Sequence, residues 1–261
     1  MPTREQFAPG EFCWIELATS NQNAAKSFYA ALFGWTANDV PIGPSDFYSL
    51  MELQGRVAAG AYTMRPDEQA AGLPSHWKLY VAVTSADDAE KRAEELGAKI
   101  IDPAFDIRDR GRTAVFHDPS GAPFYVWQPN KRSGLGVTGE PGAFCWAELI
   151  TPDLARAKTF YEGLFGWKLM PGQDKDSGYL HIVNGKNYIA GVPPAHANSA
   201  SEPPHWLIYF AVADVDKTFQ RAKELHARIL LRPMDFEGVG RVAMLADPQG
   251  AVFALFRGEQ H

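Results

Sequence analysis

Two glutamates that recur beside tryptophans are the residues best placed to do chemistry in this sequence. Trp14 precedes Glu16 by two residues, and Trp146 precedes Glu148 in the same way. Residues two apart on a β-strand point to the same face, so each carboxylate is expected beside an indole ring. Such a carboxylate must be paired, solvated or raised in pKa, and a raised pKa suits a general base. Glu16 and Glu148 are therefore the candidate catalytic residues.

Two histidines recur in the same manner, each in front of a tryptophan at the start of a predicted strand. His76 precedes Trp77, and His205 precedes Trp206. A histidine at such a position can bind a ligand, shuttle protons or cap the neighbouring proline-rich loop. The sequence leaves these three roles open.

Two other repeated pairs have simpler interpretations. Cys13 and Cys145 occupy the same position in both halves, where packing of homologous cores places them, and we expect buried thiols rather than a disulfide or a nucleophile. Arg112 and Arg241 each follow a glycine at a strand start. They could clamp an anionic ligand or form surface ion pairs.

These pairs arise because the chain contains the same block twice. Residues 10–35 and 142–167 align without a gap and share 15 of 26 positions, namely Gly10, Phe12, Cys13, Trp14, Glu16, Leu17, Thr19, Ala25, Lys26, Phe28, Tyr29, Leu32, Phe33, Gly34 and Trp35. Such internal similarity indicates two homologous domains. We set their boundaries at residues 1–130 and 142–261, joined by a linker at 131–141. Residues 134–139 match the dinucleotide-binding motif GxGxxG. They lead into a predicted strand rather than a helix, so this match does not predict a nucleotide site.

The elements that must position these residues follow from hydrophobic periodicity. Residues 12–18 alternate as a half-buried strand, and residues 25–33 have the spacing of an amphipathic helix that ends at Gly34. In the second half the same helix is predicted to start with Thr151 as N-cap and Pro152 as its first residue. The other predicted elements of the first half are strands at 47–53 and 56–64, a loop at 66–75, a strand at 76–83, a helix at 86–97, and strands near 100, at 113–117 and at 123–127.

Composition excludes several classes of protein. The net charge is -6 and the basic residues are scattered, so a nucleic-acid partner is not expected. No apolar run reaches the roughly 18 residues of a membrane span, and the N-terminus does not have the pattern of a signal peptide. We therefore expect a cytoplasmic protein without a membrane partner, either a monomer or a homodimer.

The repeated FYxxLFGW block, the paired βαβββ units and the DPxG turns at 118–121 and 247–250 together resemble the vicinal oxygen chelate superfamily. This superfamily contains glyoxalase I, bleomycin-resistance proteins and extradiol dioxygenases, and the chain looks like its tandem two-domain members. The resemblance covers essentially all of both halves. It implies an α+β fold of two tandem glyoxalase-like domains, each made of paired βαβββ units that form an open cup-like barrel around a cavity.

The resemblance also identifies where a metal would be bound. The metal enzymes of the superfamily carry His, Gln or Glu on three cavity-facing strand positions, which match Trp14, Lys78 and Tyr125 in the first domain and Trp146, Leu207 and Ala254 in the second. These residues are poor ligands for a divalent metal, so we predict no metal and no other cofactor. A shift of two residues along the same strand face would bring Glu16 and His76, or Glu148 and His205, to ligand positions.

In such a cup, strand alternation predicts an aromatic cavity with a few polar groups. The cavity of the first domain is expected to present Trp14, Glu16, His76, Lys78, Tyr80, Tyr125 and Trp127, and that of the second Trp146, Glu148, His205, Tyr209 and Phe256. Aromatic walls suit a planar or ring-containing organic molecule. In the alternative interpretation these rings only fill the barrel, with Glu16 paired to Lys78. The polar content favours the first domain as the working one.

Three hypotheses of function follow. The first is a metal-free protein, either a binder of a small organic ligand or an acid–base enzyme built on Glu16. The second is a metal-dependent lyase or oxygenase of the glyoxalase type that uses Glu16 and His76. The third is a non-catalytic interaction scaffold or an exported antigen, although nothing in the sequence supports export.

Overall fold

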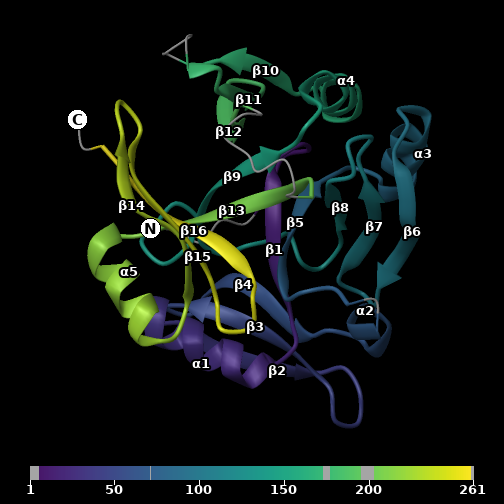
Figure 1. Ribbon diagram of the computed structural model, residues 1–261. Helices are drawn as coiled ribbons and strands as arrows, with labels where there is room; N and C mark the ends of the chain where they lie inside the picture. Colours follow the sequence, from purple (N-terminus) through teal and green to yellow (C-terminus); the bar gives the residue numbers. More distant parts are fainter. Residues whose placement is uncertain (1–5, 71, 173–176, 195–202, 260–261) are drawn as a thin grey trace.

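The computed structural model describes residues 6–70, 72–172, 177–194 and 203–259 (Figure 1). The first half contains β1 (Phe12–Thr19), α1 (Gln22–Phe33), β2 (Thr36–Pro41), β3 (Phe47–Leu53), β4 (Arg56–Thr63), α2 (Pro66–Ala70), β5 (His76–Ala82), α3 (Ala86–Glu95), β6 (Lys99–Ile107), β7 (Gly111–His117) and β8 (Pro123–Pro129). The second half contains β9 (Phe144–Ile150), α4 (Leu154–Phe165), β10 (Lys168–Pro171), β11 (Leu180–Asn184), β12 (Asn187–Val192), β13 (His205–Ala211), α5 (Val215–Glu224), β14 (Arg228–Phe236), β15 (Gly240–Ala246) and β16 (Val252–Gly258).

Each half forms one open eight-stranded sheet, so the prediction of two tandem α+β domains is confirmed. The strand orders are β2-β3-β4-β1-β5-β8-β7-β6 and β10-β11-β12-β9-β13-β16-β15-β14. In the first sheet β1 and β5 pair antiparallel at the centre, and each pairs in parallel with the last strand of its own unit. This pairing is the predicted arrangement of two βαβββ units joined side by side.

Three local predictions were wrong. The edge strand β2 was missed because its residues are almost all exposed, so its sequence lacks the alternation that marks a half-buried strand. The predicted loop at 66–75 contains α2, which begins with Pro66. The N-cap of α4 is Asp153, whose side chain accepts from the backbone of Arg156, and not Thr151.

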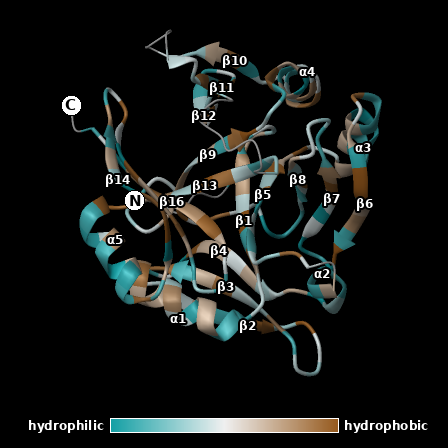
Figure 2. Ribbon diagram, viewed as in Figure 1, coloured by the Kyte–Doolittle hydropathy of each residue, from teal (hydrophilic) through white to brown (hydrophobic). Residues whose placement is uncertain are grey.

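The two domains share one continuous hydrophobic core. The first helix of each domain packs against the other domain: Phe28 of α1 meets Phe253 with ring centroids 6.3 Å apart, and Phe160 of α4 meets Phe124 at 5.6 Å. Consequently α1 lies beside α5, and α4 lies beside α3 (Figure 1). Figure 2 shows the hydrophobic residues concentrated on the central strands, while α3 and α5 carry many hydrophilic ones.

A buried tyrosine joins each of these helices to the DPxG turn of the other domain. Tyr29 donates to Asp247 at 3.0 Å, and Tyr161 donates to Asp118 at 3.0 Å. Burial raises the pKa of both tyrosines well above their usual range, so both remain protonated donors. The turns therefore do more than the predicted hairpin connection, because their aspartates also hold the two domains together.

The linker is an ordered part of the first domain. Leu135 is fully buried and donates its N–H to the carbonyl of Cys13 at 2.9 Å, and Arg56 holds Glu140 through two bonds of 2.8 and 2.7 Å. Residues 134–139, which match the GxGxxG motif, lead into β9 and not into a helix, as predicted. Among the described residues, no helix is both long enough and apolar enough to cross a membrane.

The two cysteines are not joined by a disulfide. Cys13 is fully buried and Cys145 is half-buried. Burial raises the pKa of the Cys145 thiol to about 12, so this side chain is protonated at neutral pH and is a poor nucleophile.

Loss of the buried tyrosine hydroxyl should destabilise both domains at once. The Tyr29 oxygen also accepts from the Trp77 indole at 3.2 Å, so Tyr29→Phe leaves two buried polar groups without this partner. We expect a loss of about 1–3 kcal/mol in the free energy of unfolding, measured by urea denaturation, with a similar loss for Tyr161→Phe. Tyr188→Phe is the control, because Tyr188 is 61% exposed. Equal stability of the Tyr29→Phe and control variants would contradict the interdomain role.

Candidate functional site

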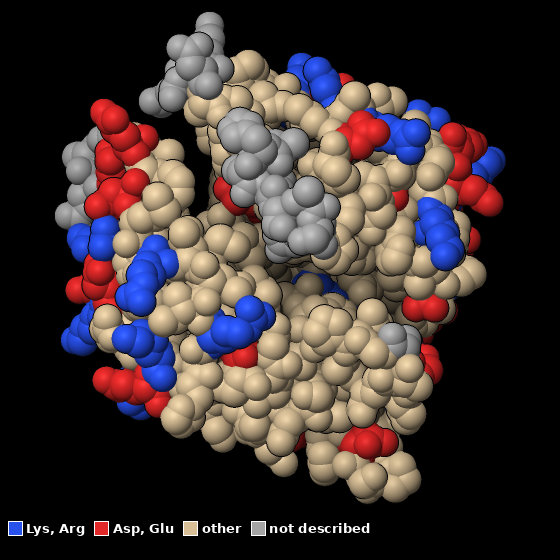
Figure 3. Space-filling view, in the orientation of Figure 1, with Lys and Arg blue, Asp and Glu red and all other residues tan. Residues whose placement is uncertain are grey.

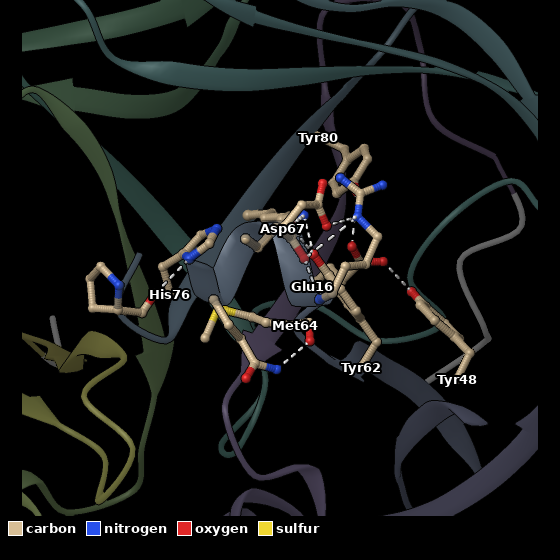
Figure 4. A network of polar contacts seen from close by, with 12 residues as sticks. Glu16, Tyr48, Tyr62, Met64, Asp67, His76 and Tyr80 are labelled. Atoms are coloured by element: carbon tan, nitrogen blue, oxygen red, sulfur yellow. Dashed lines mark hydrogen bonds and ion pairs between the residues drawn. The ribbon is translucent and has the colours of Figure 1, made fainter. Parts of the chain in front are cut away.

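Glu16 lies on the concave face of the first sheet, where two tyrosines bind its carboxylate. Tyr48 from β3 donates to one oxygen at 2.7 Å, and Tyr80 from β5 donates to the other at 3.0 Å. The Trp14 indole in turn donates to the Tyr48 oxygen at 3.1 Å. Glu16 and Tyr80 are both buried. Figure 4 shows Tyr48 reaching Glu16 from the side.

A glycine on β4 makes room for this contact. Gly60 pairs with Glu16 across the parallel strands, and a Cβ atom on it would lie 2.0 Å from the Tyr48 hydroxyl. Gly191 has the same relation to Glu148 and Tyr179, where the distance would be 1.7 Å. Any side chain at these positions would push the tyrosine away from the carboxylate.

The second domain repeats the cluster. Glu148 accepts from Tyr179 at 2.8 Å and from Tyr209 at 2.5 Å, and the Trp146 indole donates to Tyr179 at 3.2 Å. Removal from water raises the pKa of Glu148, and the two phenol hydrogen bonds oppose that rise only in part. Its surroundings are more apolar than those of Glu16, since Leu207 and Ala254 belong to a separate small hydrophobic cluster with Ile150, Tyr209 and Val242.

The pairing of Glu16 with Lys78, which belonged to the alternative interpretation, is wrong. The two residues are cross-strand neighbours, but the Lys78 ammonium instead lies 3.3 Å from Glu68 of α2 and donates to Tyr62. It also lies 5.2 Å from the centre of the Tyr125 ring. The short helix missed from the sequence supplies Glu68, which is why the wrong partner was inferred.

A cavity of about 1620 Å³ opens on this face of the first domain. Its lining includes every residue predicted for the first cavity, namely Trp14, Glu16, His76, Lys78, Tyr80, Tyr125 and Trp127. The predicted alternation of the strands therefore brings these side chains together. His205 of the second domain lines the same cavity, whereas Trp146 and Tyr209 lie at the Glu148 cluster. Figure 3 shows the hollow at the centre of this side of the molecule.

The aromatic residues make a continuous wall within the cavity. The rings of Tyr80 and Tyr125 lie 4.8 Å apart, and Trp127 follows Tyr125 on the same face of β8. The exposed part of the lining includes large apolar side chains, namely Ile42, Phe47, Leu73, Ile101, Phe105 and Ile107, beside charged ones such as Asp46 and Arg108. A ligand can thus contact apolar groups from the mouth to the wall.

The histidines contact the proline-rich loops that precede them. His76 Nδ1 lies 2.9 Å from the Pro74 carbonyl, and His205 Nδ1 lies 2.9 Å from the Pro203 carbonyl (Figure 4 shows His76). Of the three roles that the sequence left open, this geometry fits a cap on the preceding loop. Burial lowers the pKa of His76, so its ring is neutral at neutral pH.

The two arginines that follow glycines form surface ion pairs. Arg112 lies 2.8 Å from Asp87, and Arg241 lies 2.6 Å from Asp216. Each also contacts a second aspartate on the neighbouring strand. This geometry supports ion pairing over the alternative of an anion clamp.

The residues that we expect at the family's metal positions do not fit a divalent metal. Trp14, Lys78 and Tyr125 all line the cavity, and none is a usual ligand. At the shifted position, both oxygens of Glu16 accept from tyrosines. Across the described residues, no three His, Cys, Asp or Glu side chains form a group that could hold a metal ion. Absence of the metal from the functional protein stays a prediction.

Several residues of the site were not predicted from the sequence. They lie away from the strands that carry the family motif: Tyr48 is on β3, Tyr62 on β4, Glu68 on α2, and Tyr179 just before β11. Arg132 comes from the linker, and its guanidinium lies 5.5 Å from the Trp14 ring. One signal was present for the tyrosines: Gly60 and Gly191 interrupt two strands, which marks close approach of another group.

The raised pKa of Glu148 predicts a pH-dependent stability. A carboxyl whose pKa is higher in the folded state stabilises the fold most at pH values below its pKa in the unfolded chain, which is about 4.3. That contribution is lost as pH rises through the folded pKa. The free energy of unfolding of Glu148→Gln, relative to that of wild type, should therefore be higher at pH 8 than at pH 4.5. Urea unfolding at both pH values measures this difference. Glu224→Gln, at an exposed position, is the control. A difference that is constant or falls with pH would contradict the raised pKa.

Comparison with known proteins agrees with this geometry. Residues 14–127 match a family model described as a glyoxalase-like domain, and residues 144–255 match the model of the glyoxalase/bleomycin resistance protein/dioxygenase superfamily. A putative glyoxylase, CFP32 of Mycobacterium tuberculosis, is 36% identical over 98% of both chains. The anthracycline biosynthesis protein DauV of Streptomyces sp. is 34% identical over 96% of this chain and 94% of its own.

Solved structures show the same fold at low sequence identity. The 2,3-dioxygenase LapB from Pseudomonas sp. KL28 superposes with a TM-score of 0.65 at 14% identity, covering 99% of this chain and 95% of that chain. A Mn(II)-bound glyoxalase from Novosphingobium aromaticivorans gives 0.63 at 16% identity, covering 95% and 82%. With full-length relatives above 30% identity, the chain belongs to the glyoxalase/bleomycin resistance protein/dioxygenase superfamily.

Proposed function

We propose that the cavity of the first domain binds a planar, ring-containing small organic molecule without a metal ion. The observation that carries this proposal is an aromatic-walled cavity of about 1620 Å³ whose exposed lining includes six large apolar side chains. Cavities for small molecules commonly measure about 300–1,000 Å³, so this one has room for a molecule of several rings. Aromatic side chains favour stacked and edge-on contacts with such rings.

The polar groups of the cavity would orient the ring. Lys78 is held by Glu68 and lies beside the Tyr125 ring, where it can donate to an oxygen of the ligand. Trp14 and Glu16 line the base of the cavity, and both are hydrogen-bonded to Tyr48. A few fixed polar groups in an apolar pocket are the usual basis of orientation and selectivity.

Two further facts support this function. The residues at the family's metal positions are an indole, an ammonium and a phenol, which suit ring binding better than metal coordination. One relative carries the name of a protein of anthracycline biosynthesis, and anthracyclines are built on fused rings. A stoichiometric divalent metal in protein purified without chelators would contradict the metal-free part of the proposal.

A neutral fluorescent ring compound tests the proposal. N-phenyl-1-naphthylamine should bind saturably, with fluorescence titration as the measurement. Tyr125→Ala should weaken binding about 5- to 10-fold, because stacked aromatic contacts contribute about 0.5–1.5 kcal/mol beyond the area they bury.

Matched variants at the two cup mouths identify the domain that binds. Phe105 and Met234 occupy corresponding positions and are 39% and 42% exposed, so neither substitution removes a core residue. Phe105→Ala should weaken binding severalfold, and Met234→Ala should not change it. No saturable binding, or an equal effect of both variants, would contradict the proposal.

A second candidate function is metal-independent acid–base catalysis by Glu16 or Glu148. The raised pKa of Glu148 favours it, since a carboxyl that titrates closer to neutral pH is a better general base. In either cluster the phenols would hold the carboxylate toward the ligand.

Once a substrate is found, glutamine variants test this role. Glu16→Gln and Glu148→Gln keep the size of the side chain and remove the base. At the catalytic position, turnover should fall about 10²- to 10⁴-fold. Full activity in both variants would leave ligand binding as the function.

A further inference from the structure

The linker supplies a guanidinium to the cavity of the first domain. Arg132 lines the cavity, and its guanidinium lies 5.5 Å from the centre of the Trp14 ring. The backbone fixes its place: its carbonyl accepts from the Trp127 indole at 3.0 Å, and its N–H donates to the Arg110 carbonyl at 3.2 Å. The charge is therefore held at one end of the aromatic wall.

This guanidinium lacks an ion-pair partner within the described part of the chain. Several other arginines of the molecule are paired, such as Arg56 with Glu140 and Arg112 with Asp87. Arg110 is the nearby cation, since it also lines the cavity, although its own guanidinium lies 3.6 Å from Asp109. Burial and then the charge of Arg110 lower the pKa of Arg132, while the charge of Glu52 opposes this shift. A guanidinium stays protonated in proteins, so a half-buried one beside another cation is a favourable place for an anion.

We infer that Arg132, with Arg110 beside it, binds an acidic group of the ring-containing ligand, such as a carboxylate or an ionised phenol. This inference rests on the proposed ring binding and names the class of ligand. The rings lie along Tyr125 and Trp127, and the anion lies at the Trp14 end. The planar guanidinium can give two parallel hydrogen bonds to a carboxylate while it stacks on the indole.

The second domain has a different composition at the matching places. Residues 99–112 correspond to 228–241, so the position of Arg110 is occupied by Val239. The position of Arg132 corresponds to 261, which lies outside the described residues. At the Lys78 position stands Leu207. The anion subsite is therefore assigned to the first domain.

Two probes that differ by one sulfonate test the inference. 8-Anilinonaphthalene-1-sulfonate carries an anion on the ring system of N-phenyl-1-naphthylamine, which is neutral. Wild type should bind the sulfonate more tightly. Arg132→Gln should reduce that preference at least about fivefold, mainly by weakening sulfonate binding, because hydrogen bonds to charged groups are about twice as strong as neutral ones.

Conservative and neighbouring variants complete the experiment. Arg132→Lys should keep part of the preference, since it retains the charge but loses the planar fork. Lys131→Gln is the matched control: it removes an adjacent linker cation that is 67% exposed and paired with Asp109. This control should leave the preference unchanged. The urea midpoint of each variant verifies that it is folded.

The outcomes separate the two proposals. Loss of preference in Arg132→Gln, with neutral binding retained, supports the anion subsite. An unchanged preference in Arg132→Gln, or an equal loss in Lys131→Gln, overturns the subsite and leaves ring binding intact. Failure of the neutral compound to bind wild type overturns the proposed function and the subsite together.

Discussion

A carboxylate among aromatic rings, buried at Glu16 and half-buried at Glu148, sets the strongest constraint on each sheet. Glu16 and Glu148 sit among aromatic rings, where an unsatisfied charge would be costly. Each is satisfied by two phenols from different segments of the chain, and each needs a glycine on a neighbouring strand to admit one of them. In the first cup these contacts connect the four adjacent strands β3, β4, β1 and β5. The same contacts place the aromatic rings that line the site.

Duplication has preserved the interdomain contacts and changed the cavities. The helix of each domain still inserts into the core of the other, and both tyrosine–aspartate pairs have the same length. The carboxylate clusters are also retained in both halves. The surroundings differ, since the first cup has Lys78 with Glu68 and Arg132 from the linker, and the second has an apolar cluster around Leu207. This asymmetry is why the proposed ligand is assigned to the first cup.

Much of this could be predicted from the sequence, and the failures have physical causes. The repeat and its alternation predicted the tandem fold and the seven first-cavity residues, because strand periodicity determines which side chains share a face. The partners of Glu16 and Lys78 were not predictable in this way. They come from strands and a short helix that are adjacent only after the sheet forms. Arg132 was not predicted as a site residue, because a linker without helical or strand periodicity gives no indication of where its side chains point.

The proposed function follows from an aromatic cavity in which the family's metal positions carry other residues. Its central claim is that rings bind along Tyr125 and Trp127 in the first domain. A crystal structure of protein purified from its native cells, without added ligand or chelator, tests this claim most directly. The account predicts ring density along this wall, with an acidic group at Arg132. A metal ion on Glu16 and His76, or a ring only in the second cup, would contradict it.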